Sequence, residues 1–315
     1  METLLKTVNL KKYFKVGKSF LHAVDDINIE IKKGQTLGVV GESGCGKSTL
    51  GRVALRLLEA TSGEIFFEGE DILKFKKEKM KEFRKQTQII FQDPYSSLDQ
   101  RMSVFQLIAE PLVMNKVFSS SMEMDDRVLD LMETVGLAER LIDAYPHEMD
   151  GGRRQRVGVA RALALNPKFI VCDEPVSALD VSIQAQILNL LMDLQDEREL
   201  TYLFISHDLS VVKHISNEIA VMYLGQCVER AETREFFKNP LHPYTKVLLS
   251  SIPVPKLTGE LNKGIVRGEV SDPIDPKPGC RFAQRCDFCK PGCVDQEIDL
   301  KEQGPGHFVA CKLYE

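Results

Sequence analysis

Apolar residues in this chain gather in short, uninterrupted runs, and segments with helical periodicity separate these runs. The apolar runs are residues 36–40 (TLGVV), 89–91 (IIF), 169–172 (FIVC) and 202–206 (YLFIS). Continuous runs of this length predict strands buried on both faces of a parallel sheet. Residues 121–146 carry helical periodicity and lie in a predicted helical insertion between Gln92 and Asp150. We therefore predict an α/β fold with a helical subdomain.

Composition narrows the class of protein further. The 315 residues suggest about two domains, and 43% apolar with 28% charged residues is ordinary for a globular protein. A net charge of -5 argues against nucleic acid as a partner. The first residues alternate apolar and charged side chains, which is unlike a secretion signal, and no run of about 18 apolar residues could span a bilayer. We expect a cytosolic chain.

A glycine-rich segment follows the first apolar run. It fits the phosphate-binding P-loop pattern in full and consists of Gly41, Glu42, Ser43, Gly44, Cys45, Gly46, Lys47 and Ser48, followed by Thr49. Glycines let backbone N–H groups surround phosphates, and a helix over about residues 50–60 would add its positive N-terminal dipole. Lys47 would reach the β- and γ-phosphates, and Ser48 would bind Mg²⁺. We read the Cys45 thiol as incidental.

Polar residues stand where three of the predicted strands end. Asp173 and Glu174 follow residues 169–172, Gln92 follows residues 89–91, and His207 follows residues 202–206. At the carboxyl end of a central strand, Asp173 would hold Mg²⁺ and Glu174 would polarise the water that attacks the γ-phosphate.

Residues 147–180 join a glycine turn, a helix, a buried strand and two carboxylates in one unbroken run, which resembles the signature and Walker B region of ATP-binding-cassette (ABC) ATPases. The resemblance implies an ABC core, with a RecA-like sheet and an antiparallel β subdomain. It implies that Gln92 is the Q-loop residue, which contacts Mg²⁺ or water, that His207 is the switch histidine, and that Asp180 lies in the D-loop. Phe14 is near the position of the aromatic residue that stacks on adenine, and the adjacent Tyr13 could fill that role instead.

The signature turn departs from the family pattern. The family has Ser-Gly-Gly-Gln, which caps a helix that points at the ATP bound by the partner subunit; this chain has Asp150, Gly151, Gly152 and Arg153. Asp150 remains a good helix N-cap, but its carboxylate also cancels part of the dipole that attracts phosphate. Arg153 is spaced to pair with Asp150 and to offset the repulsion. Our hypothesis is a heterodimer with one competent ATP site and one weakened site that borrows this turn.

The last part of the chain is rich in proline and cysteine. Residues 239–245 (NPLHPYT) and the cysteine pattern of residues 279–311 resemble the extension of the oligopeptide and dipeptide branch of ABC importers. The cysteines at the positions of that branch are Cys280, Cys286, Cys293 and Cys311. Four thiolates suit a structural [4Fe–4S] cluster, with zinc as the alternative. Cys289 is an additional cysteine and leaves the choice of the fourth ligand open.

The resemblance covers nearly the whole chain and implies its organisation and partners. Residues 1–235 would be the nucleotide-binding domain, with the helical subdomain at about 93–160, and residues 236–315 would be the extension. The chain would use ATP and Mg²⁺ to power a peptide importer from the cytoplasmic face of the membrane. Its partners would be a second ABC ATPase, two transmembrane permease subunits and an extracytoplasmic solute-binding protein. Two alternatives stay open: an importer for nickel complexes or oligosaccharides, and a soluble ABC ATPase outside transport.

Overall fold

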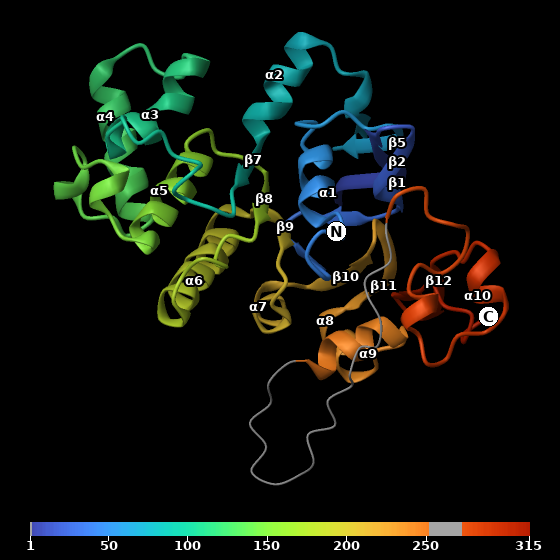
Figure 1. Cartoon of the computed structure of the whole chain (residues 1–315). Helices are drawn as coiled ribbons and strands as arrows, with labels where there is room; N and C mark the ends of the chain where they lie inside the picture. The colour runs from blue at the N-terminus through green and yellow to red at the C-terminus, as the bar shows by residue number, and fades with distance from the viewer. Residues whose placement is uncertain (1, 252–272) are drawn as a thin grey trace, which may run out of the picture. The chain divides into compact units, whose positions relative to one another are not determined.

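The computed structural model describes residues 2–251 and 273–315. These residues form two compact units: residues 1–74 with 204–315, and residues 75–203. In Figure 1 the first unit is blue at its beginning and orange to red at its end, and the second is teal, green and yellow. The chain returns to the first unit within β9 (Thr201–Ile205).

An antiparallel sheet occupies the amino-terminal part of the first unit, as predicted. Its strand order is β2-β1-β5-β6, and β3 also pairs with β1. The strands are β1 (Thr3–Val16), β2 (Ser19–Ile27), β3 (Glu30–Lys32), β5 (Ser62–Phe67) and β6 (Glu70–Asp71). Leu5 and Thr7 of β1 are buried on the same face as Ile65 of β5, which pairs with Thr7, since successive side chains of a strand point to opposite sides.

A second set of strands in the first unit runs in the order β12-β13-β11-β10-β4. These strands are β4 (Thr36–Val40), β10 (Glu218–Tyr223), β11 (Gln226–Glu232), β12 (Lys301–Gly304) and β13 (His307–Val309). All residues of β4 are buried, and β4 pairs with β10 in parallel, as its continuous apolar sequence predicts. Because β13 pairs with β11, the carboxyl-terminal residues extend the same set of strands that carries the glycine-rich loop.

The helices of the first unit are α1 (Lys47–Ala54), α7 (Leu209–Ile215), α8 (Thr233–Lys238), α9 (Pro243–Ser250) and α10 (Gly292–Asp295). The helix predicted over residues 50–60 is therefore shorter and ends at Ala54. Arg56 has a φ of 49°, a left-handed conformation that a continuing right-handed helix excludes.

The second unit places two parallel strands among helices. Its elements are α2 (Lys77–Gln86), β7 (Thr87–Ile90), α3 (Val104–Asn115), α4 (Ser121–Thr134), α5 (Gly151–Leu163), β8 (Phe169–Asp173) and α6 (Val181–Arg198). Ile90 of β7 lies opposite Cys172 of β8. The residues that follow these two strands therefore emerge at the same edge.

The predicted helical subdomain is present: α3, α4 and α5 pack on one another and are drawn in green in Figure 1. A capping box starts α3, in which the Ser103 hydroxyl accepts from the Gln106 N–H and the Gln106 side chain accepts from the Ser103 N–H. The helical periodicity of residues 121–146 yields a helix only as far as Thr134. Gly136, with a φ of 67°, supplies the left-handed residue that commonly terminates a helix.

Candidate functional site

The glycine-rich loop connects β4 to α1, which is the strand, loop and helix order that the sequence predicts. Gly46 is the N-cap of α1 with a φ of 104°, and a Cβ there would lie 1.8 Å from the carbonyl oxygen of Ala23. A Cβ at Gly41 would lie 2.1 Å from the carbonyl oxygen of Met222. Only glycine fits these two positions, because both the backbone conformation and the neighbouring backbone exclude a side chain.

Lys47 lies over this loop, and its side chain is only 5% exposed. Its Nζ donates to the carbonyl oxygens of Gly41 at 2.8 Å and Glu42 at 3.0 Å. The ammonium is thereby held above the loop, where an anionic ligand would meet it. The Cys45 thiol is also buried, and burial raises its pKa, so the thiol stays neutral.

Two residues of the carboxyl-terminal part hold Glu42 of the same loop. The Glu42 N–H donates to the hydroxyl of Tyr244 at 2.9 Å, and Arg285 donates from both terminal nitrogens to the two carboxylate oxygens at 3.0 Å each. Sequence reasoning missed both residues, since a separation of 243 positions between Glu42 and Arg285 carries no local signal.

The polar residues at the two strand ends of the second unit lie together. The amide nitrogen of Gln92 donates to a carboxylate oxygen of Glu174 at 3.0 Å. Asp173, the last residue of β8, is 2% exposed. Glu174 has a φ of 48°, which is uncommon outside glycine and aims its side chain differently from a continuing strand. A carboxylate, an amide and a second carboxylate thus stand at one edge of the paired strands.

The altered signature turn starts α5, as expected of an N-cap residue. An Asp150 carboxylate oxygen accepts from the Arg153 N–H at 2.8 Å, and Nε of Arg153 lies 3.5 Å from the other carboxylate oxygen. The predicted cap and the predicted ion pair are both confirmed. Gly152 permits close contact with α6, because a Cβ there would lie 2.7 Å from Cγ2 of Ile183, and Gly151 lies beside Leu179.

The remaining predicted residues fall at element ends or within strands. His207 is exposed and lies between β9 and α7, whose N-cap is Asp208. Asp180 is exposed and is the N-cap residue of α6.

The two aromatic candidates differ in their surroundings. Tyr13 stacks on His22 with ring centroids 3.8 Å apart and donates its hydroxyl to Asp25. Phe14 is half-buried, and Nζ of Lys12 lies 4.9 Å from its ring centroid. The rings of both residues thus already have neighbours, and the Tyr13 hydroxyl has a partner as well.

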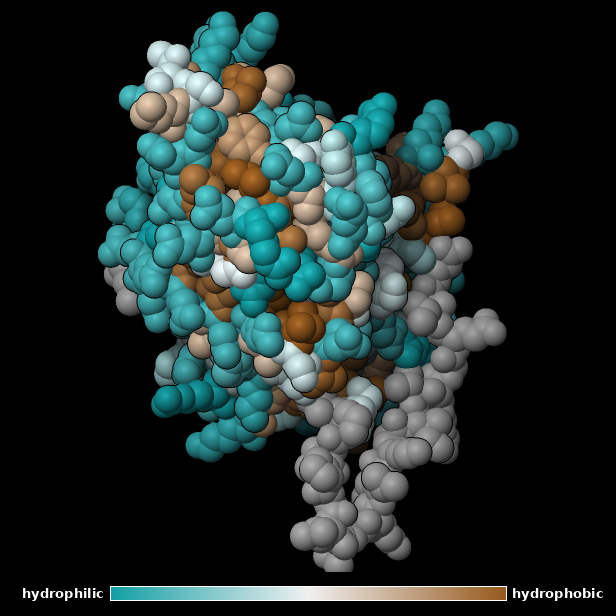
Figure 2. Space-filling view, turned by 90° about the vertical axis from the view of Figure 1, so that its left-hand side faces the viewer, coloured by the Kyte–Doolittle hydropathy of each residue, from teal (hydrophilic) through white to brown (hydrophobic). Residues whose placement is uncertain are grey.

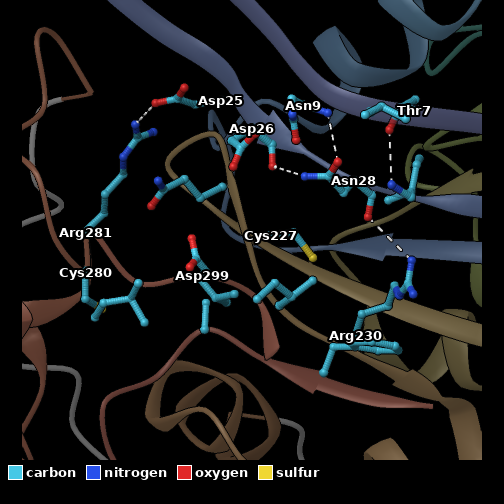
Figure 3. A pocket seen from close by; sticks show the side chains of 18 of the residues that line it. Thr7, Asn9, Asp25, Asp26, Asn28, Cys227, Arg230, Cys280, Arg281 and Asp299 are labelled. Atoms are coloured by element: carbon cyan, nitrogen blue, oxygen red, sulfur yellow. Dashed lines mark hydrogen bonds and ion pairs between the residues drawn. The ribbon is translucent and has the colours of Figure 1, made fainter. Parts of the chain in front are cut away.

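A cavity of about 570 Å³ opens elsewhere in the first unit (Figure 3). Residues of β1 and β11 line it together with carboxyl-terminal residues, including Cys280 and Arg281. The charged pair of Arg281 and Asp25 lies at its edge in Figure 3. None of the predicted nucleotide-binding residues lines this cavity.

The predicted metal ligands in the carboxyl-terminal part do not form a metal site in the structure. Within residues 2–251 and 273–315, no group of three or more His, Cys, Asp or Glu side chains could hold a metal ion. The thiols are close enough to affect one another: burial first, and then the nearby Cys311, Cys286 and Cys293, raise the pKa of Cys280 to about 12. The predicted ligand set is therefore not supported by the arrangement of the described residues.

Comparison with known protein families assigns this set of motifs. The family model described as "ABC transporter" matches residues 24–177, and "Oligopeptide/dipeptide transporter, C-terminal region" matches residues 228–293. Solved structures agree: the dimeric ATP-binding cassette MJ0796 bound to ADP and Pi is 28% identical, with a TM-score of 0.67 over 73% of this chain and 99% of that chain. The cbiO1 subunit from Clostridium perfringens is also 28% identical, with a TM-score of 0.68 over 76% of this chain and 92% of that chain. Fold and motifs define an ABC-type ATPase, which confirms the predicted class.

Similar proteins of known name show to which branch of the ABC ATPases the chain belongs. The oligopeptide transport ATP-binding protein AppF of Bacillus subtilis is 48% identical over 99% of this chain and 98% of its own length. The oligopeptide protein OppF of Salmonella typhimurium is 48% identical, over 98% of this chain and 96% of its own length. The dipeptide protein DppF of Escherichia coli is 45% identical, over 98% and 94%. The chain belongs to the ATP-binding subunits of the oligopeptide/dipeptide ABC transporter family.

Proposed function

We propose that this chain hydrolyses ATP to power the import of oligopeptides or dipeptides. The contact between Gln92 and Glu174 beside the buried Asp173 carries the catalytic part of the proposal, because it joins a candidate base to a candidate metal ligand. The transported solute is inferred from the relatives, which are named for oligopeptide and dipeptide transport.

The phosphates of ATP would bind at the loop over Gly41–Ser48. Lys47 supplies a buried positive charge there, and the uncapped N-terminus of α1 adds backbone donors. Asp173, Ser48 and Gln92 provide the carboxylate, hydroxyl and amide oxygens that Mg²⁺ prefers. When bound, Mg²⁺ would neutralise charge on the transferred phosphoryl group.

Glu174 would take the proton of the attacking water. It accepts a hydrogen bond from Gln92, which fixes the carboxylate in one orientation. General-base assistance of this kind contributes about 10²–10⁴ in rate. His207 would help to orient the water, and Phe14 would stack on adenine.

The two ATP sites of the transporter would differ. This chain would use its own phosphate loop, Glu174 and His207 against the signature turn of a partner ATPase, and Asp180 would lie at the dimer interface. The opposite site would borrow Asp150 to Arg153. The carboxylate of Asp150 is exposed at the N-terminus of α5, where it opposes an approaching phosphate. A heterodimer confines this disadvantage to one of the two sites.

The second unit offers a surface for a membrane-spanning partner. Apolar side chains are exposed near the end of α3, at the start of α4 and just after Gln92: Tyr95, Val113, Met114, Val117 and Met122. Met114 and Met122 are each 73% exposed. Figure 2, in which the side that carries α3 and α4 faces the viewer, shows brown areas among hydrophilic residues. Exposed apolar surface of this kind is typical of protein interfaces. It supports docking of a permease at the cytoplasmic face.

None of the helices in residues 2–251 and 273–315 has the length and apolar composition that a bilayer span requires. By analogy with the family, permease subunits and a solute-binding protein would be separate chains of the transporter.

We also propose that residues 236–315 form the extension typical of the oligopeptide and dipeptide branch, and that it binds a [4Fe–4S] cluster, or zinc, through Cys280, Cys286, Cys293 and Cys311. The support is that four thiols match the ligand count of such a site, and that the Cys280 N–H donates to the Cys293 carbonyl oxygen at 2.7 Å, which holds two of the four residues together. Anaerobically purified protein should be brown and contain about four iron atoms per chain. A colourless protein without iron or zinc would refute the proposal.

Glu174→Gln tests the main function. The variant should bind MgATP normally, while ATP hydrolysis at this chain's own site falls by about 10²–10⁴ because the base is lost. Both proteins should be assembled with their permeases in vesicles, and ATP hydrolysis and uptake of a labelled peptide should be measured together. Peptide uptake should fall with hydrolysis. Normal hydrolysis in the variant would exclude Glu174 as the base, and peptide-independent hydrolysis without uptake in the unmodified transporter would exclude peptide import.

A further inference from the structure

Glu42 is the one carboxylate within the phosphate loop, and it is held from outside that loop. Three of its groups have partners in the first unit. Its N–H donates to Tyr244, its carbonyl oxygen accepts from Lys47, and its carboxylate accepts two hydrogen bonds from Arg285. Tyr244 and Arg285 both belong to the carboxyl-terminal part of the chain, which the family model for the oligopeptide/dipeptide C-terminal region covers.

The surroundings of Arg285 make it a fixed partner and not a mobile surface residue. Its side chain is 6% exposed, against 27% for Glu42. It also donates to the hydroxyl of Tyr223 at 3.1 Å, and its guanidinium lies 5.6 Å from the ring centroid of Phe282. Hydrogen bonding to Glu42 raises the pKa of Arg285, so its guanidinium keeps its positive charge. A bidentate guanidinium also fixes the direction in which the carboxylate points.

The position of Glu42 gives this contact a consequence for ATP. The carboxylate belongs to a loop whose task is to surround a highly charged anion, and like charges at short range repel strongly where water is partly excluded. Arg285 neutralises that carboxylate and draws it toward the extension.

We propose that Arg285 is a positioning residue of the ATP site: it neutralises the Glu42 carboxylate and holds it away from the bound triphosphate. The carboxyl-terminal part of the chain is then a structural component of the nucleotide site. The inference rests on the assignment of Gly41–Ser48 as that site.

Three variants of the full-length chain test this role: Arg285→Gln, Glu42→Gln and the double variant. MgATP affinity should be measured by calorimetry. Arg285→Gln exposes the Glu42 charge to the triphosphate, and we expect about tenfold weaker binding. The double variant removes that charge and should recover most of the loss. Glu42→Gln alone should bind MgATP at least as tightly as the unmodified chain, because it leaves a positive charge beside the loop.

Matched controls separate this effect from a loss of folding. Lys312→Gln removes a cation of the same part of the chain, one that pairs with Glu315 and not with the loop, and should leave MgATP affinity unchanged. Arg285→Lys keeps the charge without the bidentate geometry and should fall between the unmodified chain and Arg285→Gln. Thermal unfolding of each variant reports the folded fraction.

The outcomes are distinct. Binding by Arg285→Gln that equals the unmodified chain would overturn the proposal, and so would a double variant as weak as Arg285→Gln. If Arg285→Gln does not fold, Glu42→Gln decides alone, because weaker MgATP binding by that variant contradicts the charge argument. Failure of the unmodified chain to bind MgATP would instead overturn the assignment of the ATP site.

Discussion

The N-termini of α1 and α5 present different groups to an anionic ligand. The N-cap of α1 is Gly46, and no side chain caps that helix. The N-cap of α5 is Asp150, whose carboxylate accepts from the Arg153 N–H. Helix N-termini attract anions through unpaired N–H groups and a positive dipole. No side chain occupies the N-terminus of α1, whereas that of α5 already holds its own carboxylate.

This difference shows how local stability and ligand binding compete at a helix terminus. A capping Asp stabilises its helix by about 0.5–2 kcal/mol relative to Ala. The uncapped terminus of α1 has no such local stabilisation and depends on distant contacts, which include those of Arg285 and Tyr244 to Glu42. We infer that distant tertiary contacts hold the phosphate loop before α1 in place. The conformation of the signature turn, in contrast, is set by residues close to it in sequence.

Of the variants that test this difference, Gly46→Ala should have the largest effect on MgATP binding. A φ of 104° is strained for any side chain, which costs about 1–3 kcal/mol. The added Cβ would also meet the Ala23 carbonyl oxygen at 1.8 Å. Together these should weaken MgATP binding by about 100-fold or more, measured by calorimetry.

Gly44→Ala is the matched control for that variant. Gly44 also has a positive φ, 79°, but a Cβ there meets nothing within 4 Å. Only conformational strain remains, so MgATP binding should weaken by about tenfold or less. Equal losses in both variants would show that close packing against Ala23 does not shape the open N-terminus of α1.

Asp150→Ser changes the N-cap of α5, the second of the two helices, and we expect a smaller effect. Serine keeps the N-cap but removes the charge, so hydrolysis at the site that borrows this turn should rise by about tenfold. The measurement uses the transporter with Glu174→Gln in this chain, which silences its own site and leaves the opposite site visible. Asp150→Ala, which removes both cap and charge, should lower stability and show whether the cap itself contributes to turnover. An unchanged residual rate in Asp150→Ser would remove the argument for a weakened site.

Residues close in sequence were the ones whose arrangement could be predicted. The loop between β4 and α1, the cap at Asp150 and the strand-end position of Glu174 all follow from local patterns. The partners of Glu42 could not be predicted, since burial of Arg285 depends on how a distant segment folds back.

The length of α1 and the arrangement of the cysteines could not be predicted from the sequence either. Arginine has no preference for the left-handed conformation that Arg56 adopts, so the sequence contained no sign of it. Because of this conformation, α1 ends earlier than predicted. The cysteine spacing indicated a ligand set, but spacing alone does not determine how the thiols are oriented, and they form no metal site among the described residues.

The N-terminus of α9 is a third case beside α1 and α5, because the side chain that caps it is a neutral base. Nδ1 of His242 accepts from the Tyr244 N–H at 3.1 Å, and the residue is 1% exposed. Burial lowers the pKa of His242 to about 3, from an ordinary value of 6.5. The unfolded chain therefore takes up a proton below about pH 6.5 while the folded chain does not, and stability is lost as the pH falls toward 3.

His242→Asn keeps a hydrogen-bond acceptor for the Tyr244 N–H but cannot titrate. Between pH 7 and pH 6 the unmodified chain should lose about 0.7 kcal/mol more unfolding free energy than this variant, and the difference should grow at lower pH. Urea unfolding at several pH values measures both curves. Because Tyr244 also accepts from Glu42, MgATP affinity measured at the same pH values shows whether loss of this cap reaches the phosphate loop. Parallel stability curves for the two proteins would mean that His242 binds a proton equally well in the folded and unfolded chain, which contradicts a cap held in its neutral form by burial.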